Sequence, residues 1–470
     1  MSNDKSYFFC GIGGSGMLPL ASIVRAGGAR VAGSDRSLDQ GRSGGKFDWL
    51  EKQGIALFAQ DGSGLLSKDQ ILVASAAIED SVPDVAAANA LGCPRMTRAE
   101  LLAELFNACP HSIAVGGTSG KSTVTGMAGW ILTQTGRDPT IMNGAVMKNF
   151  SGEDSPFASS RVGNGDLFVS EVDESDGSIA LYRPEVAVLN NISLDHKTMD
   201  ELHRLFGDFL TTAHHAIWNA DDAESRALRA TLDLTDAISF GFADDADVRA
   251  SDVEESPLSS RFTLHIGGQS LAVILQVPGR HNIANALAAI AAVHVLGVPA
   301  TAAAQAIAGF SGLGRRFERV GETNGIVVID DFGHNPDKVA ATLATLKAFE
   351  GRVIAFFQPH GYGPIRVMGK ELAQVFADRL NAEDRVIICD PAYFGGTVDR
   401  SVGAEFIVDA INSAGGADGV RAEHIPSRDD CENRIVALAR PGDRIVIMGA
   451  RDDTLSAFAR SVLCAIARSG

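Results

Sequence analysis

The sequence predicts an α/β protein of three domains, and three observations support this prediction. Short apolar segments alternate with helical patterns, which is typical of parallel sheets covered by helices. Two of these segments lead directly into glycine-rich loops. With 470 residues, the chain is too long for a single hydrophobic core. We expect a Rossmann-like N-terminal domain at 1–109, a central parallel-sheet domain at 110–312 and a Rossmann-like C-terminal domain at 313–470.

Each domain has its own run of predicted elements. In the first, we predict strands at 7–10, 29–32 and 71–74 and a helix at 99–106. In the second, we predict strands at 113–115, 167–170 and 186–189, a helix that begins at Val124, a β-rich section at about 236–277 and a helix at 282–296. In the third, we predict strands at 326–329, 353–357, 386–389 and 444–448.

Composition narrows the functional class. The net charge of −17 argues against non-specific nucleic-acid binding, which needs a basic surface, although local loops can still bind phosphate. We find no signal sequence and no run of 18 apolar residues, so no membrane association is expected. The six cysteines are scattered without a Cys-x-x-Cys pair and are expected to be reduced, small core residues. Together these features predict a cytoplasmic protein.

The first glycine-rich loop to consider follows the apolar segment 113–115. It reads Gly-Gly-Thr-Ser-Gly-Lys-Ser-Thr, and backbone N–H groups in such a turn converge on a phosphate at a helix N-terminus. Val115 stands where the common phosphate-loop pattern has glycine, but the shorter form Gly-Thr-x-Gly-Lys-Ser is complete. An ordinary glycine turn is the alternative. We favour a P-loop-type ATP site comprising Gly117, Thr118, Ser119, Gly120, Lys121, Ser122 and Thr123, with the Ser122 hydroxyl on Mg²⁺.

A second glycine loop lies near the N-terminus, between a predicted strand and a predicted helix. It has the pattern Gly-x-Gly-x-x-Gly, and Asp35 follows at the distance where an acidic residue meets a ribose hydroxyl. The pattern fits a nucleotide-sugar diphosphate, a dinucleotide, or tight strand–helix packing without a ligand. The second, complete ATP loop disfavours a dinucleotide. The candidate residues for the nucleotide sugar are Gly11, Gly13, Gly14, Ser15, Gly16 and Asp35.

Acidic residues follow the strand at 167–170. Glu171 begins the run Glu-Val-Asp-Glu-Ser-Asp, and the strand at 186–189 leads to Asp195 and His196. Carboxyl ends of parallel strands meet at the ligand crevice, so Glu171 and His196 are candidates to hold a second Mg²⁺. A solvated turn and a hydrogen-bonded core histidine are the alternatives.

Taken in order, these segments resemble the Mur ligases, which build the peptidoglycan stem peptide with ATP, and most closely the branch that adds L-alanine. The resemblance covers nearly the whole chain. Besides both glycine loops and the acidic run, the matching segments are 33–35, 98–105, 279–282, 314–318, 330–336 and 357–360.

The resemblance implies an ATP-dependent ligase that joins the carboxylate of UDP-N-acetylmuramate, or a related acid, to an amino acid through an acyl phosphate. Its implied ligands are ATP, Mg²⁺, a nucleotide sugar and an amino acid, and the expected state is a monomer or weak homodimer. The implied catalytic residues are Lys121, Glu171 and His196. The other implied roles are adenine contacts for Asn282 and Asn285, ATP phosphate and ribose contacts for Arg316 and Asp331, and amino-acid contacts for His334 and Arg451. On the residues alone, Asn282 reads as a helix cap and Arg316 as a surface ion pair.

Departures from the family pattern lie mainly at the amino-acid end. No lysine occurs between Lys197 and Lys338, which fits the alanine-adding branch, because that branch lacks the carbamylated lysine of other Mur ligases. The usual His-Arg-Tyr-x-Arg segment is replaced by 360–364, His-Gly-Tyr-Gly-Pro, and Phe332 replaces the usual tyrosine. Arg366 is a candidate replacement for one missing arginine, and Arg451 either clamps an acceptor carboxylate or pairs with a neighbouring aspartate. The alternatives are therefore another acceptor, such as a recycled murein tripeptide, another acid donor, an NAD(P)-dependent oxidoreductase, or a non-catalytic nucleotide-binding protein.

Overall fold

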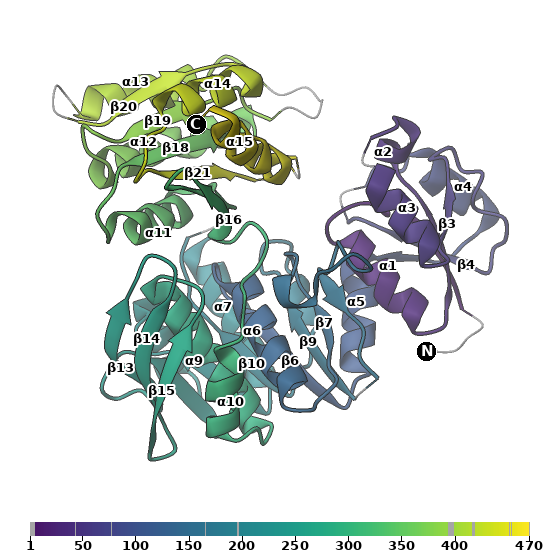
Figure 1. Cartoon of the computed structure of the whole chain (residues 1–470). Helices are drawn as coiled ribbons and strands as arrows, with labels where there is room; N and C mark the ends of the chain where they lie inside the picture. The colour runs from purple at the N-terminus through teal and green to yellow at the C-terminus, as the bar shows by residue number, and fades with distance from the viewer. Residues whose placement is uncertain are drawn as a thin grey trace. The chain divides into compact units, whose positions relative to one another are not determined.

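The computed structural model describes residues 5–42, 44–76, 78–164, 166–194, 197–392, 399–415, 419–450, 452 and 454–469. The chain forms two compact units. The first comprises 1–253, 261–275 and 282–311, and the second comprises 254–260, 276–281 and 312–470. Figure 1 traces the chain through helices and sheets in both, and the predicted α/β class is confirmed.

The N-terminal sheet has five parallel strands in the order β3-β2-β1-β4-β5. Its strands are β1 (Ser6–Cys10), β2 (Arg30–Ser34), β3 (Ala56–Phe58), β4 (Gln70–Ala74) and β5 (Arg95–Thr97). Its helices are α1 (Met17–Ala26), α2 (Arg36–Asp39), α3 (Gly44–Lys52), α4 (Pro83–Leu91) and α5 (Arg98–Asn107). The helix α5 begins with a capping box, in which the Thr97 hydroxyl and the Glu100 carboxylate each accept a backbone N–H. The three strands and the helix predicted here are confirmed.

The second sheet has ten strands in the order β15-β14-β13-β12-β11-β10-β6-β9-β7-β8. Its parallel centre is β6 (His111–Gly116) between β10 (Val186–Leu189) and β9 (Leu167–Glu171), and the residues 113–115 are fully buried, as a continuous apolar strand requires. The other strands are β7 (Thr140–Met142), β8 (Ser160–Arg161), β11 (His215–Asn219), β12 (Ala237–Gly241), β13 (Val248–Glu255), β14 (Ser260–Ile266) and β15 (Gln269–Leu275). The β-rich section predicted at about 236–277 is therefore confirmed.

Helices accompany this sheet, and one of them corrects the sequence prediction. They are α6 (Lys121–Gln134), η1 (Lys148–Phe150), η2 (Ser178–Leu181), α7 (Met199–Thr212), α8 (Ala223–Thr231), α9 (Arg280–Val295) and α10 (Ala300–Ile307). The predicted start of α6 at Val124 is wrong, because the helix begins at Lys121, directly after Gly120. The first three residues of the helix are polar, so a prediction based on the spacing of apolar residues could not detect where it starts.

The second unit contains a six-stranded sheet in the order β16-β17-β21-β18-β19-β20, parallel except for β16. The strands are β16 (Glu318–Thr323), β17 (Ile326–Asp331), β18 (Val353–Gln358), β19 (Arg385–Ile388), β20 (Arg421–His424) and β21 (Arg444–Gly449). One apolar cluster packs α11 (Pro336–Lys347), α12 (Tyr362–Arg379) and α13 (Glu405–Gly415) against the sheet, and another packs α14 (Arg428–Leu438) and α15 (Leu455–Ser469). Helices thus cover both faces, as in a Rossmann-like domain.

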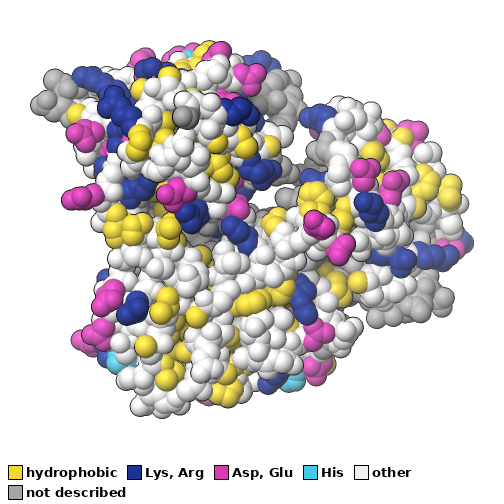
Figure 2. All heavy atoms as spheres, in the orientation of Figure 1, with side chains coloured by type: hydrophobic (Ala, Val, Ile, Leu, Met, Phe, Trp, Pro, Cys, Tyr) yellow, Lys and Arg dark blue, Asp and Glu magenta, His cyan; other side chains and the backbone are white. Residues whose placement is uncertain are grey.

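Surface features agree with the composition. On the face shown in Figure 2, acidic and basic side chains are interspersed. Among the described residues, no helix combines the length and the apolar character that a membrane crossing requires. The six cysteines are free thiols, and four are buried as predicted, but Cys109 is half-buried and Cys464 is exposed.

Candidate active site

The phosphate loop connects β6 to α6, and its backbone requires glycine at two positions. Gly117 has φ of 125° and Gly120 has φ of 82°, both in the region that disfavours other residues. A Cβ atom on Gly120 would lie 2.2 Å from Nδ2 of Asn190 and 2.6 Å from Oδ1 of Asn285. The loop is therefore shaped both by its own glycines and by two asparagines that close around it.

A chain of asparagine side chains supports this loop from the neighbouring elements. The Ser119 N–H donates to Oδ1 of Asn191 at 2.9 Å, and Nδ2 of Asn190 donates to the Ser119 carbonyl at 2.9 Å. Asn190 also donates to Oδ1 of Asn285 at 3.0 Å, and Asn285 donates to Oδ1 of Asn282 at 3.2 Å. Asn282 is the third residue of α9, so the helix-cap interpretation of this residue is wrong. The structure thus brings Asn282 and Asn285 to the phosphate loop.

The polar side chains of the loop are bonded to the acidic run that follows β9. The Lys121 ammonium donates to the Gly117 carbonyl and to Oε2 of Glu174, both at 2.8 Å. The Ser122 hydroxyl donates to Oε2 of Glu171 at 2.6 Å. Ser122 and Glu171, predicted as metal ligands, are therefore in direct contact, whereas the contact with Glu174 was not anticipated from the sequence.

Burial influences the ionisation of this acidic run. Burial raises the pKa of Glu174, although the neighbouring Lys121 charge and hydrogen bond oppose the shift. Burial also acts to raise the pKa of Asp173, but hydrogen bonds from Ser175 and the charges of Lys121 and Arg98 outweigh it and hold the pKa below its usual value. Burial thus outweighs the Lys121 contact in its effect on the pKa of Glu174, whereas contacts within the site outweigh burial for Asp173.

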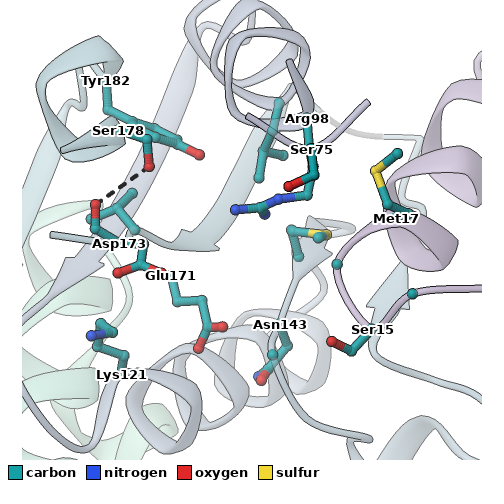
Figure 3. A pocket seen from close by; sticks show the side chains of 16 residues that line it. Ser15, Met17, Ser75, Arg98, Lys121, Asn143, Glu171, Asp173, Ser178 and Tyr182 are labelled. Atoms are coloured by element: carbon teal, nitrogen blue, oxygen red, sulfur yellow. Dashed lines mark hydrogen bonds between the residues drawn. The ribbon is translucent and has the colours of Figure 1, made fainter. Parts of the chain in front are cut away.

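A cavity of about 400 Å³ opens beside these residues in the first unit. Figure 3 shows Lys121 and Glu171 on one side, Ser15 of the N-terminal glycine loop and Met17 of α1 on another, and the Arg98 side chain pointing into the space. The lining residues are Gly14, Ser15, Gly16, Met17, Ser75, Arg98, Leu102, Lys121, Met142, Asn143, Gly144, Glu171, Val172, Asp173, Ser178 and Tyr182. Both predicted glycine loops thus reach one cavity.

Three of these lining residues have roles that the sequence did not indicate. Asn143 is fully buried and donates to the carbonyl of Ser122 at 2.9 Å, which fixes the first turn of α6. Arg98 lies against the glycine loop, since a Cβ atom on Gly16 would be 3.0 Å from its Cδ atom. Tyr182 is buried, and its burial raises the pKa of its hydroxyl. The only signal for Arg98 was its place in a matching segment, and we found none for Asn143.

The N-terminal glycine loop is held by Asp35. Gly11 has φ of 79°, and the carboxylate of Asp35 accepts the N–H of Gly13 at 2.9 Å. The other oxygen of this carboxylate accepts the Ser37 N–H at 2.8 Å and caps α2. Asp35 thus lies next to the loop as predicted, and both of its oxygens accept backbone N–H groups.

In the second unit, the predicted residues gather where β17 ends. Asp331 accepts the Phe317 and Gly333 N–H groups at 2.7 and 2.8 Å. The guanidinium carbon of Arg316 lies 4.4 Å from the centre of the Phe332 ring, a cation–π contact that the sequence did not indicate. His334 packs edge-on against Phe332, and burial lowers its pKa to about 3. Arg451 lies outside the described residues.

A polar network at the ends of β18 and β21 was missed by sequence reasoning. The guanidinium of Arg428 donates to Oδ2 of Asp452, to Oε1 of Gln358 at 2.8 Å and to the Thr454 hydroxyl at 2.7 Å. Gln358 also donates to Oδ2 of Asp452 at 3.2 Å. Asp452, considered as a partner of Arg451, is therefore paired with Arg428, which no local pattern in the sequence pointed out.

The predicted second metal site is only partly described. His196 lies outside the described residues, as does Asp195. Within the described ranges, no group of three or more His, Cys, Asp or Glu side chains is arranged to hold a metal ion. The Ser122 hydroxyl and the Glu171 carboxylate are nevertheless adjacent oxygen donors, the type that Mg²⁺ prefers.

Comparison with known proteins matches the chain in three consecutive segments. Residues 6–109 match the Mur ligase family, catalytic domain; 115–293 match the Mur ligase middle domain; and 315–451 match the Mur ligase glutamate ligase domain. A UDP-N-acetylmuramate–L-alanine ligase of Agrobacterium fabrum is 34% identical over 463 residues, which cover 95% of this chain and 94% of that protein. One from Cereibacter sphaeroides is 33% identical, covering 97% and 95%.

Two solved structures are similar along nearly the whole chain. The UDP-N-acetylmuramate–alanine ligase of Thermotoga maritima has a TM-score of 0.80 at 24% identity, covering 99% of this chain and 100% of that one, and supports the fold. A murein peptide ligase of Psychrobacter arcticus has a TM-score of 0.72 at 26% identity, covering 98% and 99%. The three family matches include residues of all three sheets, and relatives more than 30% identical match the chain over most of its length. The chain therefore belongs to the Mur ligase family.

Proposed function

We propose that the chain is an ATP-dependent ligase that forms an amide bond between the carboxylate of UDP-N-acetylmuramate and L-alanine. One observation carries this proposal: Lys121 of the phosphate loop and Glu171 of the acidic run line the same cavity as the N-terminal glycine loop. A phosphate donor and a nucleotide-linked acid bound to the two loops would therefore meet. The relatives named UDP-N-acetylmuramate–L-alanine ligase support these substrates.

The chemistry requires activation of a carboxylate. A carboxylate oxygen attacks the γ-phosphorus of ATP, the bond to the ADP oxygen breaks, and an acyl phosphate forms. The amine nitrogen then attacks the carbonyl carbon, and the tetrahedral intermediate expels inorganic phosphate while the amine loses a proton. The first step brings two anions together, so we assign Lys121 to neutralise the transferring phosphate. Water must be excluded, because it would hydrolyse the acyl phosphate.

Mg²⁺ fits the donor set next to this lysine. We assign the Ser122 hydroxyl to a first ion and Glu171 with His196 to a second, which would supply positive charge at the phosphates. The 2.6 Å contact between Ser122 and Glu171 supports this assignment, because it places the two oxygen donors side by side next to the phosphate loop.

The remaining assignments follow the family. We assign Asn282 and Asn285 to the adenine, Arg316 to the ATP phosphates and Asp331 to the ribose. We assign His334 and Arg451 to the amino acid. We further assign the acid donor to 1–109, ATP to 110–312 and the amino acid to 313–470. A cytoplasmic location and a monomer or weak homodimer remain predictions.

Phosphate release tests the function directly. ATP, Mg²⁺ and UDP-N-acetylmuramate are mixed with L-alanine, with glycine or L-serine, or with the tripeptide L-alanyl-γ-D-glutamyl-meso-diaminopimelate. We expect release that depends on the acceptor and is greatest with L-alanine. A preference for the tripeptide would indicate a murein peptide ligase instead. If no phosphate is released with UDP-N-acetylmuramate and any acceptor, the proposed role in peptidoglycan synthesis would be wrong. The relatives do not favour an oxidoreductase, which would bind nicotinamide and keep its activity in Lys121→Ala.

A further inference from the structure

The ammonium group of Lys121 is held by a carboxylate that no role in the reaction explains. Its Nζ atom lies 2.8 Å from Oε2 of Glu174 and 2.8 Å from the Gly117 carbonyl. We propose that Glu174 is an internal counter-ion, which occupies Lys121 until the β- and γ-phosphates of a nucleotide displace it, and which thereby lowers the affinity for ATP. This inference rests on the proposed ATP site and adds a positioning residue to it.

The geometry places the carboxylate in competition with phosphate. The lysine is folded back over its own loop, because its second acceptor is the carbonyl of Gly117 at the start of that loop. The side chain of Lys121 is 19% exposed and that of Glu174 is 4% exposed, so little water screens the pair. The ammonium has three donors, and Gly117 and Glu174 accept two of them, so contacts with both the β- and γ-phosphates would require one of these acceptors to be released.

Glu174 is separable from the carboxylate assigned to metal binding. Glu171 is bonded to Ser122, whereas Glu174 is bonded to Lys121, so each acid has its own partner in the loop. The turn around Glu174 has hydrogen bonds that do not involve its carboxylate, since the Ser175 N–H donates to Oδ1 of Asp173 at 2.9 Å and the Gly177 N–H donates to the Glu174 carbonyl at 3.1 Å. Substitution of Glu174 therefore changes the charge beside Lys121 without removing these turn contacts.

A neutral residue of the same shape tests the idea. Glu174→Gln keeps an oxygen acceptor but removes the charge that phosphate must displace, so ATP should bind more tightly by about three- to tenfold. The dissociation constant for ATP with Mg²⁺ is measured by calorimetry without acid donor or amino acid. AMP should gain nothing, because it lacks the phosphates that a phosphate-loop lysine reaches.

A matched control comes from the other end of β6. Glu185 lies 2.8 Å from Nδ1 of His111, and Glu185→Gln removes a similar carboxylate contact far along the strand from the loop. This control should bind ATP like the unaltered protein. ATP affinity that is unchanged or weaker in Glu174→Gln, or an equal gain for AMP, would overturn the counter-ion role alone. Absence of ATP binding in the unaltered protein would overturn the proposed function as well.

Discussion

The phosphate loop and the carboxyl edge of the second unit's sheet both place charges in close contact, but they are assembled differently. In the loop, glycines, lysine and serine come from one short segment, and the acids of a second segment complete it. At the sheet edge, Gln358, Arg428 and Asp452 come from three separate elements. The difference indicates that the phosphate loop is encoded by short sequence segments, whereas the polar network at the sheet edge depends on the tertiary fold.

Removing the lysine tests the locally encoded region and should have the largest effect. Lys121→Ala removes the cation assigned to the transferring phosphate, so kcat should fall by about 10²–10³-fold. Phosphate release at saturating substrates measures this loss. Far-ultraviolet circular dichroism should remain unchanged, since the side chain is not part of the apolar core. Activity within a few-fold of the unaltered protein would contradict the role of the loop.

A substitution at the sheet edge tests the other region. Asp452→Asn removes the charge that holds Arg428, so the KM for L-alanine should rise by about tenfold, with a stability loss of about 1–3 kcal/mol. The KM for ATP, measured in the same assay, should change little. A rise in the KM for ATP of the same size would show that the sheet edge does not act on the amino acid alone, and would contradict the difference drawn between the two regions. Arg385→Gln is a suitable control, because the hydrogen bonds that this half-buried side chain donates within the described part of the chain go to the nearby carbonyls of residues 382–384.

The smallest expected effect concerns pH and refines the description of the sheet edge. Burial lowers the pKa of His334 to about 3 from its ordinary 6.5, so between these values the unfolded chain binds a proton that the folded chain does not. Stability should therefore fall as the pH falls through this window. Relative to His334→Asn, the unaltered protein should lose about 1 kcal/mol between pH 7 and pH 5.5.

Hydrogen exchange of peptides from β17 and β18 measures this loss in the second unit itself. The three tryptophans are all found before residue 219, so their fluorescence would report on the first unit. Parallel pH profiles for the two proteins would show that His334 is not buried in its neutral form.

The sequence predicted the fold well because its strands are continuous buried runs, such as those at 113–115 and 186–189. It misplaced the start of α6, since Lys121, Ser122 and Thr123 lack the apolar periodicity on which that prediction depended. It located Asn282 and Asn285 through family likeness alone, because their contact with the loop depends on Asn190, which follows β10. It could not pair Arg428 with Asp452, since no short-range pattern links residues on separate elements.

The asparagines around Gly120 have a consequence for how the first unit tolerates change. Asn190 hydrogen-bonds both to the phosphate loop and to Asn285, and a side chain on Gly120 would collide with both amides. The loop, the residue that follows β10 and the helix α9 are therefore connected by these hydrogen bonds, and a displacement of one is expected to displace the others. A mutation that shifts α9 would therefore change the conformation of the loop without altering any loop residue, so compensating substitutions should be sought in the helix and the loop together.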